Sequence, residues 1–439
     1  MNALSSGNLK KDYARFVVPT VVSLAVFSLY SMVDGIFVGR LIGPEALAAV
    51  NLGAPFLNIL FSAAMLLAVG TGTRIAALLG EGRHDDADRL FTQNVVSAAL
   101  LGVLITAVTV VFAEPICRLL GARGDTLADT KSYVGTLAWF SVFFILEYNL
   151  EVLVKTDGRP RLAMVTVICA SVLNAVLDWY FIARLHWGIF GAAFATGLSQ
   201  LLATCIFLAH FLFGKNRLLT LRRFRFDLRI YRELLPIGVP DGSVELCTAG
   251  MTWLYNRTIL RFLGTAGVSA FTPVTYVNTV MLNVLTGASQ GMQPLVSYHR
   301  GAGEPESCRK LLRCAVAAQA MMALVCFAVL QGFAGGVAGL FLDAGSMAIR
   351  DETVHILRRF ACSYLVLGFN IVCAGYLTAN ERPGPALCIT AGRGFAVQAL
   401  MVLSLAALFG IEGVWWAPLA AELLVAAFSA AAIRRGRQA

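Results

Sequence analysis

Long apolar runs are the feature that most constrains what this chain can fold into. A helix that crosses the hydrocarbon core of a bilayer needs about 20 apolar residues, and the 439-residue sequence contains twelve such runs. They lie near residues 15–38, 47–79, 90–113, 132–154, 162–184, 188–213, 231–262, 267–298, 311–341, 354–379, 384–409 and 412–433. With 58% hydrophobic and 14% charged residues, the chain is far more apolar than a soluble domain. The sequence predicts an all-α integral membrane protein with twelve transmembrane helices.

The short motifs of common soluble enzymes and redox proteins are missing. The sequence has no H-E-x-x-H or P-loop motif, and none of its ten cysteines forms a C-x-x-C pair. We expect no enzyme activity, no catalytic residue and no cofactor. A membrane-embedded transferase is the alternative from another class, but the sequence has no carboxylate-rich metal motif that would support it.

The positive charges predict the orientation of the chain. Twenty-three of the 35 lysine and arginine residues fall on the side of the termini and ten on the other side. Because positive loops stay in the cytoplasm, we predict a multi-pass protein with both termini cytoplasmic, and a bacterial inner membrane as its location. The net charge of +9 does not indicate nucleic-acid binding, since the basic stretch 215–232 suits a cytoplasmic anchor near anionic lipid.

Weak internal similarity divides the chain into two halves. At a shift of 217 positions Arg15 and Pro19 fall on Arg232 and Pro236, and at shifts of 221 and 222 further identities preserve the order. We predict an N-terminal six-helix lobe at 1–214, a basic cytoplasmic linker at 215–230 and a C-terminal six-helix lobe at 231–439. Such pseudo-symmetric repeats are typical of transporters, in which the ligand binds between lobes that rock to give alternating access.

Polar residues inside the apolar runs are functional candidates, because burying them in lipid is costly. Asp34 lies in the first run, Asn174 and Asp178 share one helix face in the fifth, and Thr196 lies in the sixth. Two carboxylates in a low dielectric can hold a proton near neutral pH. Together with the Asn and Thr oxygens they could instead hold Na⁺. The repeat places no acid at the C-terminal counterparts, so this cluster is unique to the N-terminal half.

Other residues in the apolar runs have both a functional and a structural interpretation. Pro19 removes a backbone hydrogen bond from the first span and predicts a hinge, although tolerated kinks are common. Candidates for lining a substrate cavity are Tyr30, Glu245, Tyr255, Met281, Met292 and Arg393. For the aromatic residues and methionines, packing is the commoner use, and Arg393 could equally neutralise a buried acid.

Three segments resemble the multidrug and toxic compound extrusion (MATE) family. They are GASQGMQPLVSYHRGAG at 287–303, DGIFVGRLIGPEALAA at 34–49 and GVWWAPLAAE at 413–422. Within the family the chain is most similar to the bacterial branch with a cation site in the N-terminal lobe. The resemblance implies that Asp34, Asn174, Asp178 and Thr196 form the coupling site, with Pro19 as the hinge and Tyr30 in the pocket.

The resemblance further implies a monomeric secondary antiporter. It would export amphipathic, often cationic drugs or toxic compounds in exchange for H⁺ or Na⁺ by a rocker-switch motion, with membrane lipid as its surroundings. The alternative within transport is a flippase for lipid or lipid-linked oligosaccharide. Flippases carry strongly cationic cavities for phosphate headgroups, whereas the central spans here hold few basic residues, chiefly Arg393 and Arg257.

Overall fold

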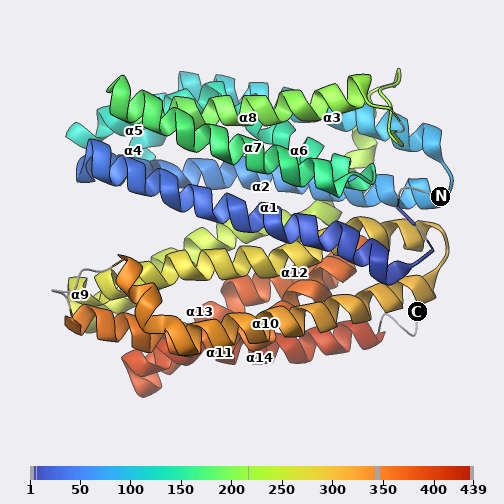
Figure 1. Ribbon diagram of the computed structural model, residues 1–439. Helices are drawn as coiled ribbons and strands as arrows, with labels where there is room; N and C mark the ends of the chain where they lie inside the picture. The colour runs from blue at the N-terminus through green and yellow to red at the C-terminus, as the bar shows by residue number, and fades with distance from the viewer. Residues whose placement is uncertain (1–3, 6, 216, 342–346, 436–439) are drawn as a thin grey trace.

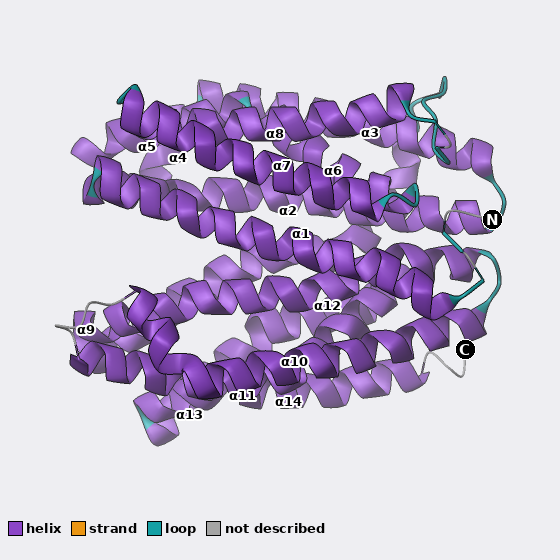
Figure 2. Ribbon diagram, viewed as in Figure 1, coloured by secondary structure: helices purple, strands orange, loops and turns teal. Residues whose placement is uncertain are grey.

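The computed structural model describes residues 4–5, 7–215, 217–341 and 347–435. Helices make up nearly all of this part, and it contains no strand (Figures 1 and 2). A helix satisfies its own backbone N–H and C=O groups, which is what a chain as apolar as this one requires in lipid. The predicted all-α class is confirmed.

The helical elements follow one another with short connections. The first half contains α1 (Leu9–Phe37), η1 (Val38–Ile42), α2 (Pro44–Gly80), α3 (His84–Val111), α4 (Ala113–Leu119), α5 (Asp125–Trp139), α6 (Ser141–Thr156), α7 (Pro160–Asp178), η2 (Trp179–Arg184) and α8 (Gly188–Phe213). The second half contains η3 (Leu228–Ile230), α9 (Tyr231–Gly301), α10 (Pro305–Phe341), α11 (Met347–Ala379), α12 (Pro383–Ala391), η4 (Gly392–Ala396), α13 (Val397–Phe409) and α14 (Ile411–Arg435). The segments η1, η2 and η4 are π-helical.

The helices account for the predicted spans. Ten helices of the described chain are long and apolar enough to cross a membrane, and α5 with α6 forms an eleventh span that is bent by 52°. α9 contains two spans, because its backbone leaves helical geometry at Gly264, where φ is 64° and ψ is −156°. The described residues thus supply twelve spans. The fourth is broken near Phe140, where the sequence predicted a continuous run over 132–154.

The spans gather into two groups, which we call the N-lobe (α1 to α8) and the C-lobe (α9 to α14). Figure 1 shows them one above the other, with both chain ends at the right-hand end of the bundle. The larger hydrophobic core is built mostly from N-lobe side chains, whereas a second core lies entirely between Met251 and Ala417. Each lobe therefore buries apolar surface of its own.

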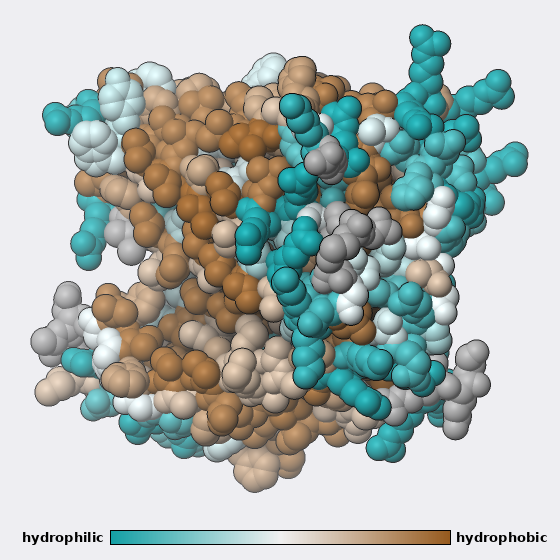
Figure 3. Space-filling view, turned by 45° about the vertical axis from the view of Figure 1, so that its right-hand side comes forward, coloured by the Kyte–Doolittle hydropathy of each residue, from teal (hydrophilic) through white to brown (hydrophobic). Residues whose placement is uncertain are grey.

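The surface divides into an apolar belt and a polar end. Side chains such as Val103 and Leu104 on α3, and Phe333 and Leu340 on α10, are more than half exposed. Figure 3 shows brown, hydrophobic surface over the middle of the molecule and teal, hydrophilic surface gathered toward the side of the termini. An apolar belt of this kind fits contact with lipid. We call the end with both termini the basic end, and the opposite one the far end.

Glycines bring the two lobes into backbone contact at the basic end. A Cβ atom at Gly80 of α2 would collide with the carbonyl oxygen of Tyr298 in α9, and one at Gly301 would collide with that of Ala77. Gly301 follows Gly80 by 221 positions, and Tyr298 follows Ala77 by the same number. One contact is therefore the pseudo-symmetric image of the other, and both require glycine.

A second set of contacts obeys the same relationship. A Cβ atom at Gly70 would collide with the carbonyl oxygen of Leu234, and a Cβ atom at Gly291 would lie 2.8 Å from the Cα of Val17. Gly291 follows Gly70 by 221 positions, and Leu234 follows Val17 by 217. The internal similarity in the sequence thus reappears as equivalent packing of α1 and α2 against the two parts of α9.

The segment 217–227 runs across the basic end of the N-lobe and is held by two buried carboxylates. Asp88 accepts hydrogen bonds from Thr220 N at 2.7 Å and Thr220 Oγ1 at 2.6 Å. Asp157 accepts from Leu218 N at 2.6 Å and Leu219 N at 2.9 Å, and lies 2.8 Å from His210 Nε2. Burial raises the pKa of the Asp157 carboxyl above its ordinary value, although His210 and the two N–H groups act in the opposite direction.

We expect the Asp88→Ala substitution to loosen this segment. It leaves the Thr220 N–H without its acceptor, at a cost of about 1–3 kcal/mol, so the melting temperature should fall and trypsin should cleave at Arg223 and Arg225 faster. The matched control is Asp85→Ala, since the Asp85 side chain is 69% exposed and contacts Arg222 at the surface. Equal cleavage of the two variants would contradict the anchoring role of Asp88.

Candidate functional site

Asp34 and Asp178 form a carboxyl pair in the N-lobe. Asp34 lies three residues before the end of α1, and Asp178 is the last residue of α7. The two carboxyl groups lie close enough to each other to interact electrostatically. Two ionised carboxylates only accept hydrogen bonds and repel each other, so they can share a hydrogen bond only when one of them carries a proton. A pair of this kind suits a site that takes up a proton.

Asn174 and Thr196 complete the cluster that the sequence predicted. Asn174 lies one turn before Asp178 on the same face of α7, and its Nδ2 donates to Thr196 Oγ1 of α8 at 3.4 Å. Thr196 Oγ1 donates in turn to the carbonyl oxygen of Ala192 at 3.1 Å. The structure thus brings together four polar side chains from α1, α7 and α8.

Two π-helical segments position this cluster. α1 runs directly into η1, and α7 runs directly into η2. Val38 of η1 and Ile182 of η2 are buried together with Ala192 of α8, one turn before Thr196. π-helical turns are rare and frequently lie at functional sites. Because both segments pack against α8, the ends of α1 and α7 that carry the carboxyl pair are held beside Thr196.

The carboxyl pair has no positively charged partner among the residues that the structure describes. Asp178 is fully buried, and neither of its carboxyl oxygens has a hydrogen-bond partner in the described chain. Asp34 Oδ1 is likewise buried without a hydrogen-bond partner there. Burying unpaired carboxylates is very costly, so their charge must be balanced by a proton or a small cation.

Aromatic side chains border the carboxyl pair. Tyr30, one turn before Asp34 in α1, lies close enough to both carboxyl groups for an electrostatic interaction, and so does Tyr133 of α5. A Cβ atom at Gly53 would lie 2.7 Å from the Tyr133 ring, so this glycine makes room for it. Sequence reasoning identified Tyr30 and missed Tyr133, because no spacing links α5 to the acidic residues.

A second polar cluster lies between the lobes, nearer the basic end. In α6, Lys155 Nζ is 2.6 Å from Glu151 Oε1, and both side chains are buried. Tyr148 Oη accepts a 3.4 Å hydrogen bond from Gln290 of α9, and Glu245 is close enough to Tyr148 to interact with it. Residues from α2, α6 and α9 line a small pocket here. Lys155 is one of the 23 lysine and arginine residues that the sequence assigns to the side of the termini, and its side chain lies in this interface.

Asp241 extends this cluster into the C-lobe. Its Oδ2 accepts a 3.5 Å hydrogen bond from Thr378 Oγ1, and Gln293 also hydrogen-bonds to it. With Glu147, Glu151 and Glu245, the interlobe region therefore holds four acidic side chains and one lysine.

The remaining cavity candidates lie in packed surroundings. Tyr255 stacks on Phe271 at a ring distance of 5.3 Å, and its hydroxyl accepts a hydrogen bond from Gln398 at 3.2 Å. Met292 is completely buried in the larger core, and Met281 packs against the C-lobe core. Neighbouring side chains cover Tyr255 and Met292 in this conformation, whereas Met281 is partly exposed.

Arg393 belongs to a buried network in the C-lobe. Its Nε lies 3.2 Å from Glu422 Oε1, and Glu422 Oε2 accepts a 2.6 Å hydrogen bond from Asn370 Nδ2. Asn370 Oδ1 accepts a further hydrogen bond from Ser429 at 2.8 Å. Arg393 was expected either to line a cavity or to neutralise a buried acid, and in this structure it pairs with the buried acid Glu422.

The sequence model of the family described as MatE matches residues 19–180 and 243–409. The chain belongs to the MatE family. The two matched segments fall on opposite sides of the basic segment 215–232, one in each lobe. Members of this family are efflux transporters rather than enzymes, as the sequence predicted.

Relatives of this MatE transporter cover almost its whole length. The multidrug export protein MepA of Staphylococcus aureus is 24% identical over 425 residues, which span 95% of this chain and 91% of the relative. A crystal structure of MATE in complex with MaL6 has a TM-score of 0.94 and 23% identity, covering 100% of this chain and 99% of the other. The outward-facing conformation of a multidrug resistance MATE family transporter of the MOP superfamily has a TM-score of 0.93 and 25% identity, covering 99% and 98%.

The C-lobe network of this MatE transporter can be tested by removing one of its charges. We expect Arg393→Met to destabilise the protein by about 3–5 kcal/mol, because Glu422 is left buried without its cation. Adding Glu422→Gln should restore most of the loss of melting temperature, since the amide is neutral and can still accept from Asn370. If the single variant melted like the wild type, the pair would have no role in stability.

Proposed function

We propose that this MatE transporter is a secondary active antiporter. It exports amphipathic, often cationic compounds in exchange for H⁺ or Na⁺, and it works by rocker-switch alternating access. The observation that carries the proposal is the carboxyl pair, which is buried without a positive partner among the described residues. Such a pair needs a cation, and an imposed gradient can supply one. Asp34, Asp178, Asn174 and Thr196 offer carboxylate, amide and hydroxyl oxygens to either ion.

Helix α1 connects the coupling site with the contact between the lobes. It carries Asp34 toward the far end, and at Val17 and Val21 it meets Gly291 and Gly287 of α9. Pro19 lies between these two contacts and lacks the N–H that would bond to the preceding turn. We infer that Pro19 is the hinge at which neutralisation of Asp34 and Asp178 changes how α1 packs. Coupling arises because the cation then binds the two states with different affinity.

The interlobe cluster supports a cationic substrate. Glu147, Glu151, Asp241 and Glu245 carry four potential negative charges against the single charge of Lys155. Tyr148 and Tyr30 add aromatic faces, which attract cations. The relatives named as multidrug export proteins support the export of small molecules. We therefore propose that Glu245 and Tyr30 line the substrate cavity.

The inward-facing and outward-facing states of the transport cycle differ in which end of the helix bundle is closed. Here the basic end is closed by the glycine contacts of Gly80 and Gly301. We infer that the basic end is cytoplasmic, following the positive charges, in a bacterial inner membrane. The conformation described here would then be outward-facing, like the outward-facing multidrug resistance MATE family transporter that it resembles.

The flippase alternative needs free basic side chains for a phosphate headgroup. Arg393 is paired with Glu422, and Arg257 lies 5.3 Å from the ring of Trp253 on an exposed helix face. Neither guanidinium is available to a central cavity in this arrangement, so we favour the antiporter.

Efflux of a cationic dye from proteoliposomes would test the proposal. The wild-type protein is assayed under an imposed pH gradient and, separately, under an imposed Na⁺ gradient. Transport that follows either gradient supports antiport and identifies the ion. Dye movement that ignores both gradients would contradict it, and lipid scrambling by the same preparation would favour the flippase.

A further inference from the structure

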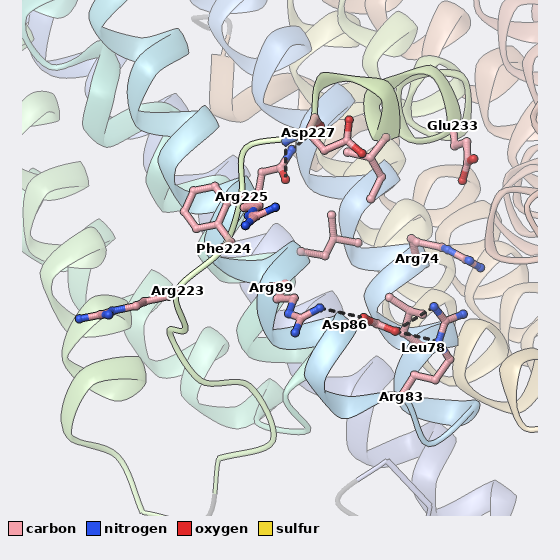
Figure 4. Close-up of a pocket in the computed structure, with 13 residues that line it drawn as sticks. Arg74, Leu78, Arg83, Asp86, Arg89, Arg223, Phe224, Arg225, Asp227 and Glu233 are labelled. Carbon is pink, nitrogen blue, oxygen red and sulfur yellow. Dashed lines mark hydrogen bonds and ion pairs between the residues drawn. The ribbon is translucent and has the colours of Figure 1, made fainter.

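A cavity of about 680 Å³ opens at the basic end, away from the carboxyl pair. Its walls come from the end of α2, the first turns of α3, the segment 223–227 and the start of α9. Figure 4 shows Arg89, Arg225 and Arg74 around its centre, while Arg223 points away at one edge. Nothing in the antiport mechanism uses this cavity.

Positive charge dominates the lining. The lining contains five arginines and three acidic residues. They are Arg74, Arg83, Arg89, Arg223 and Arg225, and Asp86, Asp227 and Glu233. Asp86 is shared, because Arg83 Nη2 is 2.8 Å from it and Arg89 Nη1 is 3.8 Å from it. Arg225 forms no ion pair with any described residue, so its guanidinium is free to bind an anion.

The wall that carries Arg225 is already held in place. Gln93 Nε2 donates to the carbonyl oxygen of Asp227 at 2.7 Å, and Asp227 N donates to Gln93 Oε1 at 3.4 Å. Three residues before Arg225, Arg222 N donates to Thr92 Oγ1 at 3.0 Å. The site is therefore preformed, and binding of a ligand costs little free energy for ordering the backbone.

Apolar side chains surround the arginines on the segment that forms this wall. Leu221, Phe226 and Leu228 are 40%, 47% and 70% exposed. Exposed apolar side chains alternating with arginines are typical of a segment at the membrane interface. The arginines can bind a phosphate headgroup while these side chains meet acyl chains.

We propose that this cavity is a discrete binding site for a phosphate-bearing anion, held mainly by Arg89 and Arg225. Guanidinium groups match phosphate oxygens in bidentate geometry. An anionic phospholipid and free phosphate share this chemistry, and the apolar surroundings favour the phospholipid. The proposal is more specific than general attraction of a basic stretch to the membrane, because it depends on two arginines that face one cavity.

Thermal unfolding of the purified full-length chain in detergent tests the site. Phosphatidylglycerol, phosphatidylcholine or inorganic phosphate is added to the wild type, to Arg89→Gln/Arg225→Gln and to Arg229→Gln/Arg232→Gln. The last variant is the matched control, since it removes the same charge near the cavity from residues that do not line it. The variants should share the elution profile of the wild type, which shows that they fold.

We expect phosphatidylglycerol to raise the melting temperature of the wild type and the control by about 2–4 °C. The cavity variant should lose this shift. The same pattern with inorganic phosphate alone would identify a soluble anion as the ligand and would support the site. Three results would overturn the proposal: equal loss in both double variants, an equal effect of phosphatidylcholine, or no shift of the wild type with any addition.

Discussion

Asp178→Asn is expected to reduce gradient-driven export by about 5- to 150-fold, which is the usual range of a coupling free energy between two sites. The amide can donate permanently to Asp34, as a protonated carboxyl would, but it cannot release a proton. The variant would thus be held in the arrangement that the transporter adopts when the carboxyl pair has a bound proton. Substrate binding should persist, because the interlobe acids are unchanged.

Transport in proteoliposomes and equilibrium dye binding, measured on the same preparation, separate these two effects. Asp34→Asn should behave in the same way, since each carboxyl needs the other. The control is Glu114→Gln, an equal change on a surface side chain that is 46% exposed and paired with Arg118. Wild-type export by Asp178→Asn at normal expression would exclude the carboxyl pair as the coupling site.

Gly80→Val and Gly301→Val are expected to lower export by about tenfold or more while leaving the protein folded. The added side chain would strike Tyr298 or Ala77 across the interface, and overpacking of this kind costs about 1–3 kcal/mol. That cost falls only on the state in which the basic end is closed. Because the two contacts are pseudo-symmetric, the two variants should have similar defects.

Dye efflux and melting temperature distinguish a conformational defect from misfolding. Gly332→Val on α10 is the matched control, because a Cβ atom there meets only open space. If Gly80→Val transported like the control, the closed contact at the basic end would be unnecessary for the cycle.

Features set by local spacing could be predicted from the sequence. Apolar runs define the spans, because lipid leaves a backbone no hydrogen-bond partners but its own. Asn174 and Asp178 share a helix face by their spacing alone. That Asp34 and Thr196 lie beside them follows from tertiary packing. The sequence offered it only as a hypothesis, based on polar residues inside apolar runs and on the resemblance to the MATE family.

Features that depend on contacts between distant helices could not be predicted in this way. Tyr133 reaches the carboxyl pair because Gly53 makes room for its ring. The partner of Arg393 is Glu422, on a different helix, and no periodicity encodes that choice. The bend between α5 and α6 lies inside an apolar run whose composition gives no sign of a break.

The π-helical segments make the geometry of the carboxyl pair depend on the number of residues in η1 and η2. A π-helical turn holds one residue more than an α-helical turn, so η1 and η2 each behave as a tolerated one-residue insertion. Deleting one residue from Val38–Ile42 would restore regular α-helix and turn the chain before it by about 100° relative to the chain after it. Asp34 would then rotate away from Asp178 although every polar residue of the cluster was still present. A one-residue deletion that removes no member of the cluster would therefore abolish the site.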